Sequence, residues 1–119
     1  MEKTGRMPDV TIYHNPRCSK SRQTLAIIRE QGHEPQIVEY LKDPPDPTTL
    51  LGLVEKLGIH PSELIRQKEY RKLGLSESNN QHELVIRMSQ HPEIIQRPIV
   101  VNGNTACIGR PPENVIDIL

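Results

Sequence analysis

Residues 10–22 read VTIYHNPRCSKSR and decide the fold, because they describe a strand that passes through a short turn into a helix. Residues 10–13 alternate apolar and polar side chains, which is typical of a short strand. His14-Asn15-Pro16 then interrupts the alternation and leads directly to Cys18. The stretch therefore predicts that Cys18 lies at the junction between a strand and the first helix.

A helix and a second strand follow this junction. Residues 21–31 carry apolar side chains with helical spacing, and Gly32 stands at the position of a C-terminal cap. Residues 35–41 read PQIVEYL and predict another strand. Residues 10–41 thus form a βαβ unit, in which we expect parallel strands and a right-handed crossover. The side chains expected on the apolar face of the helix are Leu25, Ala26, Ile27 and Ile28.

A helical insertion is predicted after the βαβ unit. Residues 43–46 read DPPD and end the second strand. Asp46 is a good N-cap with Pro47 at the first helical position, and the apolar stripe of that helix runs to Gly58. A short helix over residues 61–67 is expected to follow.

The next segment, residues 68–80, is polar and mixed, so it predicts a loop with one helical turn around residues 70–73. We hypothesise that this loop closes over the functional site. A helix is predicted over residues 80–90, where it is closed by His91-Pro92, because a residue before proline resists the α conformation.

Residues 98–108 contain the clearest hairpin signal. Residues 98–101 and 105–108 predict two antiparallel strands, and an Asn-Gly pair within residues 102–104 supplies the turn. Pro112 then opens a terminal helix. The side chains expected to face inward from that helix are Val115, Ile118 and Leu119.

This order of elements predicts an α/β fold. We expect a four-stranded mixed sheet with flanking helices and a helical insertion between the second and third strands. The 119 residues match the size of one domain, so residues 1–119 are predicted to form a single domain with residues 1–9 as a polar N-terminal extension.

The composition limits the function classes. Fifteen basic and fifteen acidic residues give a formal net charge of zero, so no global field favours a nucleic acid or an anionic membrane. Residues 1–9 lack the apolar run of a signal peptide, and no stretch approaches about 18 apolar residues. We therefore expect a cytoplasmic protein without membrane or nucleic-acid partners. Two cysteines do not make a disulfide framework of the secreted kind.

Cys18 is the candidate nucleophile. The start of a helix presents unpartnered backbone N–H groups, and its positive dipole end, with Arg17, Lys20 and Arg22 nearby, favours a thiolate. Free cysteines are often small buried hydrophobes, but the surrounding Pro, Ser, Lys and Arg residues favour the reactive interpretation. His14 is compatible with two roles, polarising the thiol or ending the strand.

The spacing around Cys18 excludes several cysteine chemistries. Redox motifs place a second cysteine three residues on, where this chain has Ser21, so no local disulfide forms. Cys107, in the hairpin, fits packing better than catalysis. The phosphatase loop needs a longer spacing than the one from Cys18 to Arg22, and a zinc site would need a second pair of ligands beside His14 and Cys18. No metal is expected.

These motifs resemble the glutathione- and glutaredoxin-coupled arsenate reductases of the thioredoxin-like superfamily. The resemblance spans residues 10–119 and rests on IYHNPRCSKSR at 12–22, RPIVV at 97–101 and GRPPE at 109–113. It implies a thioredoxin-like fold with a helical insertion and a cis bond before Pro98. It also implies that Cys18 attacks arsenate, that glutathione attacks the thiol-arsenate adduct, and that glutaredoxin clears the mixed disulfide, which leaves arsenite.

The resemblance also implies a binding site for the oxyanion. The three arginines that bind it in the family match Arg66, Arg97 and Arg110, and paired hydrogen bonds from guanidinium groups suit a tetrahedral oxyanion. His14 matches a position thought to help ionise the cysteine. Glutathione is expected as a co-substrate, with no bound cofactor.

Two other functions stay open from the sequence. One is a regulatory protein similar to thioredoxin-like factors that bind RNA polymerase and sense thiol stress, although those sensors use a Cys-x-x-Cys pair and this chain has Ser21 at the second position. The other is a reductase of glutathione mixed disulfides that does not act on arsenate.

Overall fold

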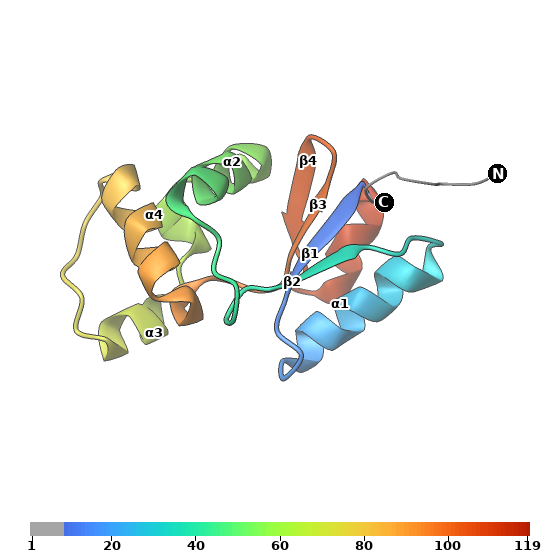
Figure 1. Cartoon of the computed structure of the whole chain (residues 1–119), viewed down its shortest axis with the longest axis horizontal. Coiled ribbons are helices and arrows are strands. Elements are labelled where there is room, and N and C mark those ends of the chain that lie inside the picture. The colour runs from blue at the N-terminus through green and yellow to red at the C-terminus, as the bar shows by residue number, and fades with distance from the viewer. Residues whose placement is uncertain (1–8) are drawn as a thin grey trace.

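The computed structural model describes residues 9–119, and most of the predicted N-terminal extension, residues 1–8, lies outside this range. Its central feature is a four-stranded sheet with the strand order β2-β1-β3-β4 (Figure 1). The strands are β1 (Val10–His14), β2 (Gln36–Glu39), β3 (Ile99–Asn102) and β4 (Thr105–Ile108). β1 pairs parallel with β2 and antiparallel with β3, so the predicted mixed sheet is confirmed.

The register of the two parallel strands positions the site. His14 lies opposite Glu39, and both strands end there. Because the strands run in the same direction, the residues that follow them, Asn15 and Tyr40, emerge at the same edge of the sheet. Tyr13 lies opposite Ile99, so the start of β3 reaches this edge too.

Helix α1 (Ser19–Glu30) begins two residues before the predicted start, because Cys18 itself takes the N-cap position. Its inward face differs from the prediction. The buried residues are Ser21, Thr24 and Ile28, whereas Ala26 is exposed. A search for apolar spacing misses this face because the side chains of its first two turns are polar, and one of them, Ser21, belongs to the site described below.

The insertion between β2 and β3 is helical, as predicted, and forms the lobe beside the sheet in Figure 1. The Asp46 carboxylate caps α2 by accepting from the Thr49 N–H at 2.7 Å, and Gly58 ends the helix in the left-handed conformation. The segment predicted to be mainly loop contains a helix of six residues. The elements are α2 (Pro47–Leu57), η1 (Pro61–Leu64), α3 (Gln67–Lys72), α4 (Gln81–Gln90) and η2 (Pro92–Ile94).

The C-terminal elements follow the predicted order with two local differences. Asn102 pairs with Thr105 in the hairpin, so the turn consists of Gly103 and Asn104, with Gly103 supplying the positive φ of 60°. The terminal helix η3 (Pro112–Ile118) is a 3-10 helix. Its Val115 is fully buried, as predicted.

Two apolar clusters cover the two faces of the sheet. Because side chains alternate along a strand, Val100 faces one cluster, while its neighbours Ile99 and Val101 face the other. The first cluster packs β1 and β3 against α1 and η3, and the second joins the sheet to the insertion. Within residues 9–119, no helix is long and apolar enough to cross a membrane.

Helix α1 packs closely against Gly109, which directly follows β4. A Cβ atom at this buried glycine would lie 2.6 Å from Thr24 Oγ1 and 3.0 Å from Pro98 Cγ. Since both neighbours are fixed in the interior, we predict that Gly109→Ala lowers the free energy of unfolding by about 1–3 kcal/mol. Urea denaturation monitored by circular dichroism measures this change. Gly52→Ala, where a Cβ meets no atom within 4 Å, is the matched control, and equal stability of the two variants would contradict the packing described here.

Candidate active site

Cys18 lies where β1 passes into α1, as the sequence predicts, and it is partly exposed. Its backbone N–H donates to the Asn15 carbonyl at 3.0 Å, and its own carbonyl accepts from the Arg22 N–H at 3.0 Å. The first bond closes the turn and the second belongs to the helix. Cys18 is therefore held by the backbone on both sides, with its sulfur at the open end of α1.

The surroundings of the Cys18 sulfur favour its ionised form. Partial burial alone would raise the pKa of the thiol, but the backbone N–H of Ser21, the Arg97 side chain and the backbone N–H of Lys20 together lower it below its ordinary value. These groups place positive charge and dipoles against the sulfur. Cys18 thus has an enhanced thiolate fraction at neutral pH.

The basic side chains adjacent to Cys18 in the sequence act differently from the prediction. Arg17 and Lys20 are exposed, and Arg22 donates from its guanidinium to the Pro16 carbonyl at 2.8 Å. The guanidinium that lowers the pKa of Cys18 comes from Arg97, 79 residues further along the chain (97 minus 18). The sequence predicted correctly that positive charge lowers the pKa of Cys18, but it assigned that charge to the neighbouring basic residues. The pairing of β1 with β3 instead brings Arg97 to the site.

His14 does not contact the sulfur directly but bonds to Ser21. Its Nδ1 lies 2.6 Å from the Ser21 hydroxyl, which also accepts from the Asn15 N–H at 3.0 Å. His14 and Ser21 are both buried, and burial lowers the pKa of His14, so its imidazole is neutral at neutral pH. Ser21 in turn supplies the backbone N–H that favours the Cys18 thiolate. The position of the missing second cysteine therefore holds a structural hydroxyl.

Arg66 and Arg97 are brought together by a short ladder between two segments of the insertion. The Arg66 N–H donates to the Ile94 carbonyl at 2.7 Å, and the Gln96 N–H donates to the Leu64 carbonyl at 2.8 Å. The antiparallel pairing is centred on Ile65 opposite Ile95, and the two segments that it joins carry Arg66 and lead into Arg97. Arg66 and Arg97 are close enough for Arg97 to lower the pKa of Arg66. Arg97 precedes Pro98 through a cis bond, which the resemblance had implied.

Arg110 joins the same group from the end of β4. The Gly109 N–H donates to the Pro98 carbonyl at 2.9 Å, which fixes the backbone beside Arg110, and the Arg110 guanidinium donates to the Arg97 carbonyl at 3.4 Å. The Arg110-Pro111 bond is also cis. We refer to Arg66, Arg97 and Arg110 as the arginine cluster.

The arginine cluster carries an excess of positive charge. Burial and the neighbouring Arg97 lower the pKa of Arg66, Glu69 and Tyr40 oppose this, and Arg110 lowers it further. Within the described residues, Glu69 is the one carboxylate that pairs with the cluster, at 3.8 Å from Arg66. The Arg97 Nε is buried without a hydrogen-bond partner. An anion beside Cys18 would relieve both the repulsion and this unsatisfied donor.

Two residues of the site were missed in the sequence. Asn15 binds the turn with its side chain as well as its backbone, since its Oδ1 accepts from the Arg17 N–H at 3.0 Å. Tyr40 is buried at 2% exposure and lies within the influence of Arg97 and Arg66. The signal that could have found them is topological, because both residues directly follow the carboxyl ends of adjacent parallel strands.

Cys107 lies in the apolar interior and not at the site around Cys18. It lies in β4, opposite Val100, and packs against the cluster under α1 and η3. Burial and Asp117 raise the pKa of its thiol. These surroundings agree with the prediction that Cys107 serves packing.

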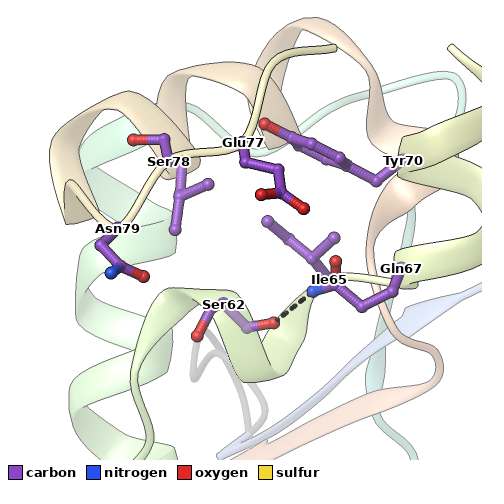
Figure 2. A pocket seen from close by; sticks show the side chains of 8 residues that line it. Ser62, Ile65, Gln67, Tyr70, Glu77, Ser78 and Asn79 are labelled. Atoms are coloured by element: carbon purple, nitrogen blue, oxygen red, sulfur yellow. Dashed lines mark hydrogen bonds between the residues drawn. The ribbon is translucent and has the colours of Figure 1, made fainter. Parts of the chain in front are cut away.

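A hollow in the helical insertion is separate from Cys18. It has a volume of about 510 Å³, and Figure 2 shows Tyr70 and Glu77 along one side of it and Ser62 across from them. The segment hypothesised to close over the site forms one wall of this hollow, and Arg87 fixes that segment by donating to the Ser76 carbonyl at 2.7 Å. None of Cys18, His14 and the arginine cluster lines it. A second hollow of about 450 Å³ reaches Arg110.

Comparison with known proteins identifies the family. The model of the ArsC family matches residues 13–118, which include Cys18 and the whole arginine cluster. The chain belongs to the ArsC family. This membership agrees with the resemblance found in the sequence, and the fold agrees as well.

Relatives in the ArsC family match over nearly their whole length. The uncharacterized protein YfgD of Escherichia coli K12 is 49% identical, with 92% of this chain and 96% of the relative covered. The arsenate reductase of Haemophilus influenzae is 45% identical, with 92% and 98% covered. The solved structure of the arsenate reductase of Vibrio cholerae superposes with a TM-score of 0.84 at 40% identity and covers 96% of this chain and 100% of that one. The thioredoxin-like fold is therefore confirmed.

The two cysteines give a prediction for this ArsC-family protein. We expect iodoacetamide to modify Cys18 rapidly at neutral pH and Cys107 slowly, because their pKa values are shifted in opposite directions. Mass spectrometry of peptides after timed alkylation separates the two sites. Arg97→Ala should move the pH midpoint of Cys18 alkylation upward. Equal rates at Cys18 and Cys107 across the pH range would contradict the assigned roles.

Proposed function

We propose that this chain reduces arsenate to arsenite, with Cys18 as the nucleophile and the arginine cluster as the oxyanion site. The observation that carries the proposal is the convergence of three guanidinium groups, one with a buried unpartnered Nε, beside an activated thiol. Arsenate is a tetrahedral dianion near neutral pH, and guanidinium groups bind such anions through paired hydrogen bonds. Arsenate reductases among the relatives support this choice of oxyanion.

The chemistry follows from the thiolate and its neighbours. The Cys18 thiolate attacks the arsenic of bound arsenate, and one arsenate oxygen leaves as water after protonation, which forms a sulfur-arsenic bond. The thiolate of glutathione then attacks the Cys18 sulfur, and the electron pair of the sulfur-arsenic bond stays on arsenic. Arsenic is thereby reduced from the pentavalent to the trivalent state and leaves as arsenite, while Cys18 and glutathione are joined in a mixed disulfide.

An external thiol completes the proposed cycle. Ser21 replaces a local resolving cysteine and is committed to His14, so the chain itself offers no Cys-x-x-Cys pair. We propose that glutaredoxin reduces the mixed disulfide, which returns the Cys18 thiolate. This chemistry requires a reducing compartment, and the cytoplasm provides one. The same absence of a pair disfavours a redox switch of the kind that thiol-stress regulators use.

The role of His14 in this proposal is to hold Ser21 in place and not to exchange a proton with Cys18. Because its imidazole is neutral and bonded to Ser21, it orients the first turn of α1, whose N–H groups favour the thiolate. This refines the two roles left open by the sequence. His14 ends the strand and, through Ser21, also supports ionisation of Cys18.

A coupled assay tests the proposed function. Purified protein is combined with NADPH, glutathione reductase, glutathione and glutaredoxin, and NADPH oxidation is recorded with and without arsenate. We expect an arsenate-dependent rate that disappears in Cys18→Ser. No arsenate-dependent rate in the wild-type protein would overturn the proposal, and a rate with glutathione mixed disulfides alone would point to the general disulfide reductase instead.

Variants of the arginine cluster test its role. Arg97→Ala and Arg110→Ala each remove charge-assisted hydrogen bonds to the anion, which contribute about 1.5–3 kcal/mol each. We therefore expect the KM for arsenate to rise roughly 10- to 100-fold. Arg71→Ala, at an exposed position on α3, is the matched control and should leave the KM unchanged. An unchanged KM in both cluster variants would exclude the cluster as the binding site.

A further inference from the structure

Glu69 places a negative charge beside the arginine cluster, and the chemistry derived so far gives it no role. Its Oε1 atom lies 3.8 Å from Arg66 Nη2 and 3.7 Å from Lys72 Nζ, so one carboxylate oxygen is shared by two cations. The side chains of Glu69 and Arg66 are 26% and 30% exposed, whereas that of Lys72 is 63% exposed. The carboxylate is therefore shared between a partly buried cation of the cluster and an exposed cation outside it.

Helix α3 keeps these three residues in line. Arg66 is the N-cap, Glu69 lies in the first turn and Lys72 is the last residue, and residues three apart share one face of a helix. The helix itself is anchored, because the Arg66 N–H donates to the Ile94 carbonyl at 2.7 Å and Tyr70 is buried at 4% exposure. Rotation of the Glu69 side chain alone therefore carries its carboxylate from Arg66 to Lys72, with no movement of α3.

In the free protein, Glu69 offsets part of the positive charge around Arg66. Arg97 and Arg110 lower the pKa of Arg66, and Glu69 acts in the opposite direction. Among the described residues, no other carboxylate forms an ion pair with the arginine cluster. A tetrahedral dianion offers the cluster more charge and more acceptor oxygens than one carboxylate does, so it competes with Glu69 for the Arg66 guanidinium.

Two simpler roles for Glu69 make different predictions. An acidic residue in the first turn stabilises a helix through its dipole, and this role alone predicts that removing the charge lowers stability and leaves anion affinity unchanged. A role in orienting Arg66 predicts that anion binding becomes weaker. The contact with Lys72 favours a third role, because it holds the carboxylate when Arg66 turns to an anion.

We propose that Glu69 is an internal counter-ion of the arginine cluster, which pairs with Arg66 in the free protein and transfers to Lys72 when an anion binds. An incoming anion displaces the carboxylate from Arg66, and this competition lowers its affinity. Glu69 contributes no atom to the bonds that form or break. The proposal rests on the proposed function in one respect, that the arginine cluster is the anion site, and it does not depend on the reduction of arsenate.

The test is Glu69→Gln, which removes the charge and keeps the shape of the side chain. Inorganic phosphate is the probe, because it is tetrahedral like arsenate and is not reduced by Cys18, and titration calorimetry measures its affinity. We expect phosphate to bind about two- to fivefold more tightly to Glu69→Gln than to the wild-type protein, which is the range for a partly exposed ion pair. Glu83→Gln is the matched control, because Glu83 pairs with Arg87 at the same distance of 3.8 Å outside the cluster, and it should leave the phosphate affinity unchanged.

Lys72→Met tests the transfer of the carboxylate from the other side. This change removes the second partner of Glu69 and leaves the carboxylate with Arg66, so we expect phosphate to bind about two- to threefold more weakly. In the Glu69→Gln background the same change should have no effect, because no carboxylate remains to be transferred. A loss of equal size in both backgrounds would reflect only the missing positive charge and would overturn the transfer.

The possible outcomes separate this proposal from the proposed function. If phosphate binds Glu69→Gln as tightly as the wild-type protein, or more weakly, the counter-ion role is wrong while the anion site stands. If phosphate binds neither protein, the anion site is wrong, and the counter-ion role with it. Phosphate binding without arsenate reduction would overturn the proposed reaction alone. If Glu69→Gln does not fold, as its melting temperature would show, Lys72→Met decides, because it retains Glu69.

Discussion

The interaction by which the Arg97 guanidinium lowers the pKa of the Cys18 thiol links the sheet to the helical insertion. Cys18 comes from the junction of β1 and α1, whereas Arg97 comes from the segment that ends the helical insertion and starts β3. The two meet because β3 pairs antiparallel with β1 and brings its first residues to the edge where β1 ends. The sheet topology thus supplies the charge that the thiolate requires, and the amino terminus of α1 supplies the N–H groups.

The helical insertion contributes Arg66 to the arginine cluster and leads directly into Arg97. Its ladder ties the segment that carries Arg66 to the segment that leads into Arg97, and the hydrogen bond from the Gly109 N–H to the Pro98 carbonyl holds the backbone beside Arg110. Three cations held this closely repel one another, and fold stability at other sites must offset that cost. An unfavourable arrangement of this kind is expected where a protein binds an anion, because the ligand supplies the missing charge.

Much of this architecture could be predicted from local patterns. The turn at His14-Asn15-Pro16, the capped helix from Asp46 to Gly58 and the hairpin over residues 98–108 each carry residues with strong conformational preferences. The inward face of α1 could not be found this way, because Ser21 and Thr24 are polar. The site residues divide similarly. Motif similarity indicated the arginines, but the positions of Asn15 and Tyr40 at the site depend on strand register, which a single sequence does not specify.

The central claim is that the arginine cluster and the Cys18 thiolate form one anion-binding site. Titration calorimetry of arsenate into Cys18→Ser tests it directly, because this variant cannot form the covalent adduct and reports the binding step alone. We expect one arsenate per chain, competition by phosphate, and affinity that weakens as ionic strength rises. Absence of binding under low salt, or binding that survives the combined replacement of Arg97 and Arg110 by alanine, would contradict the account.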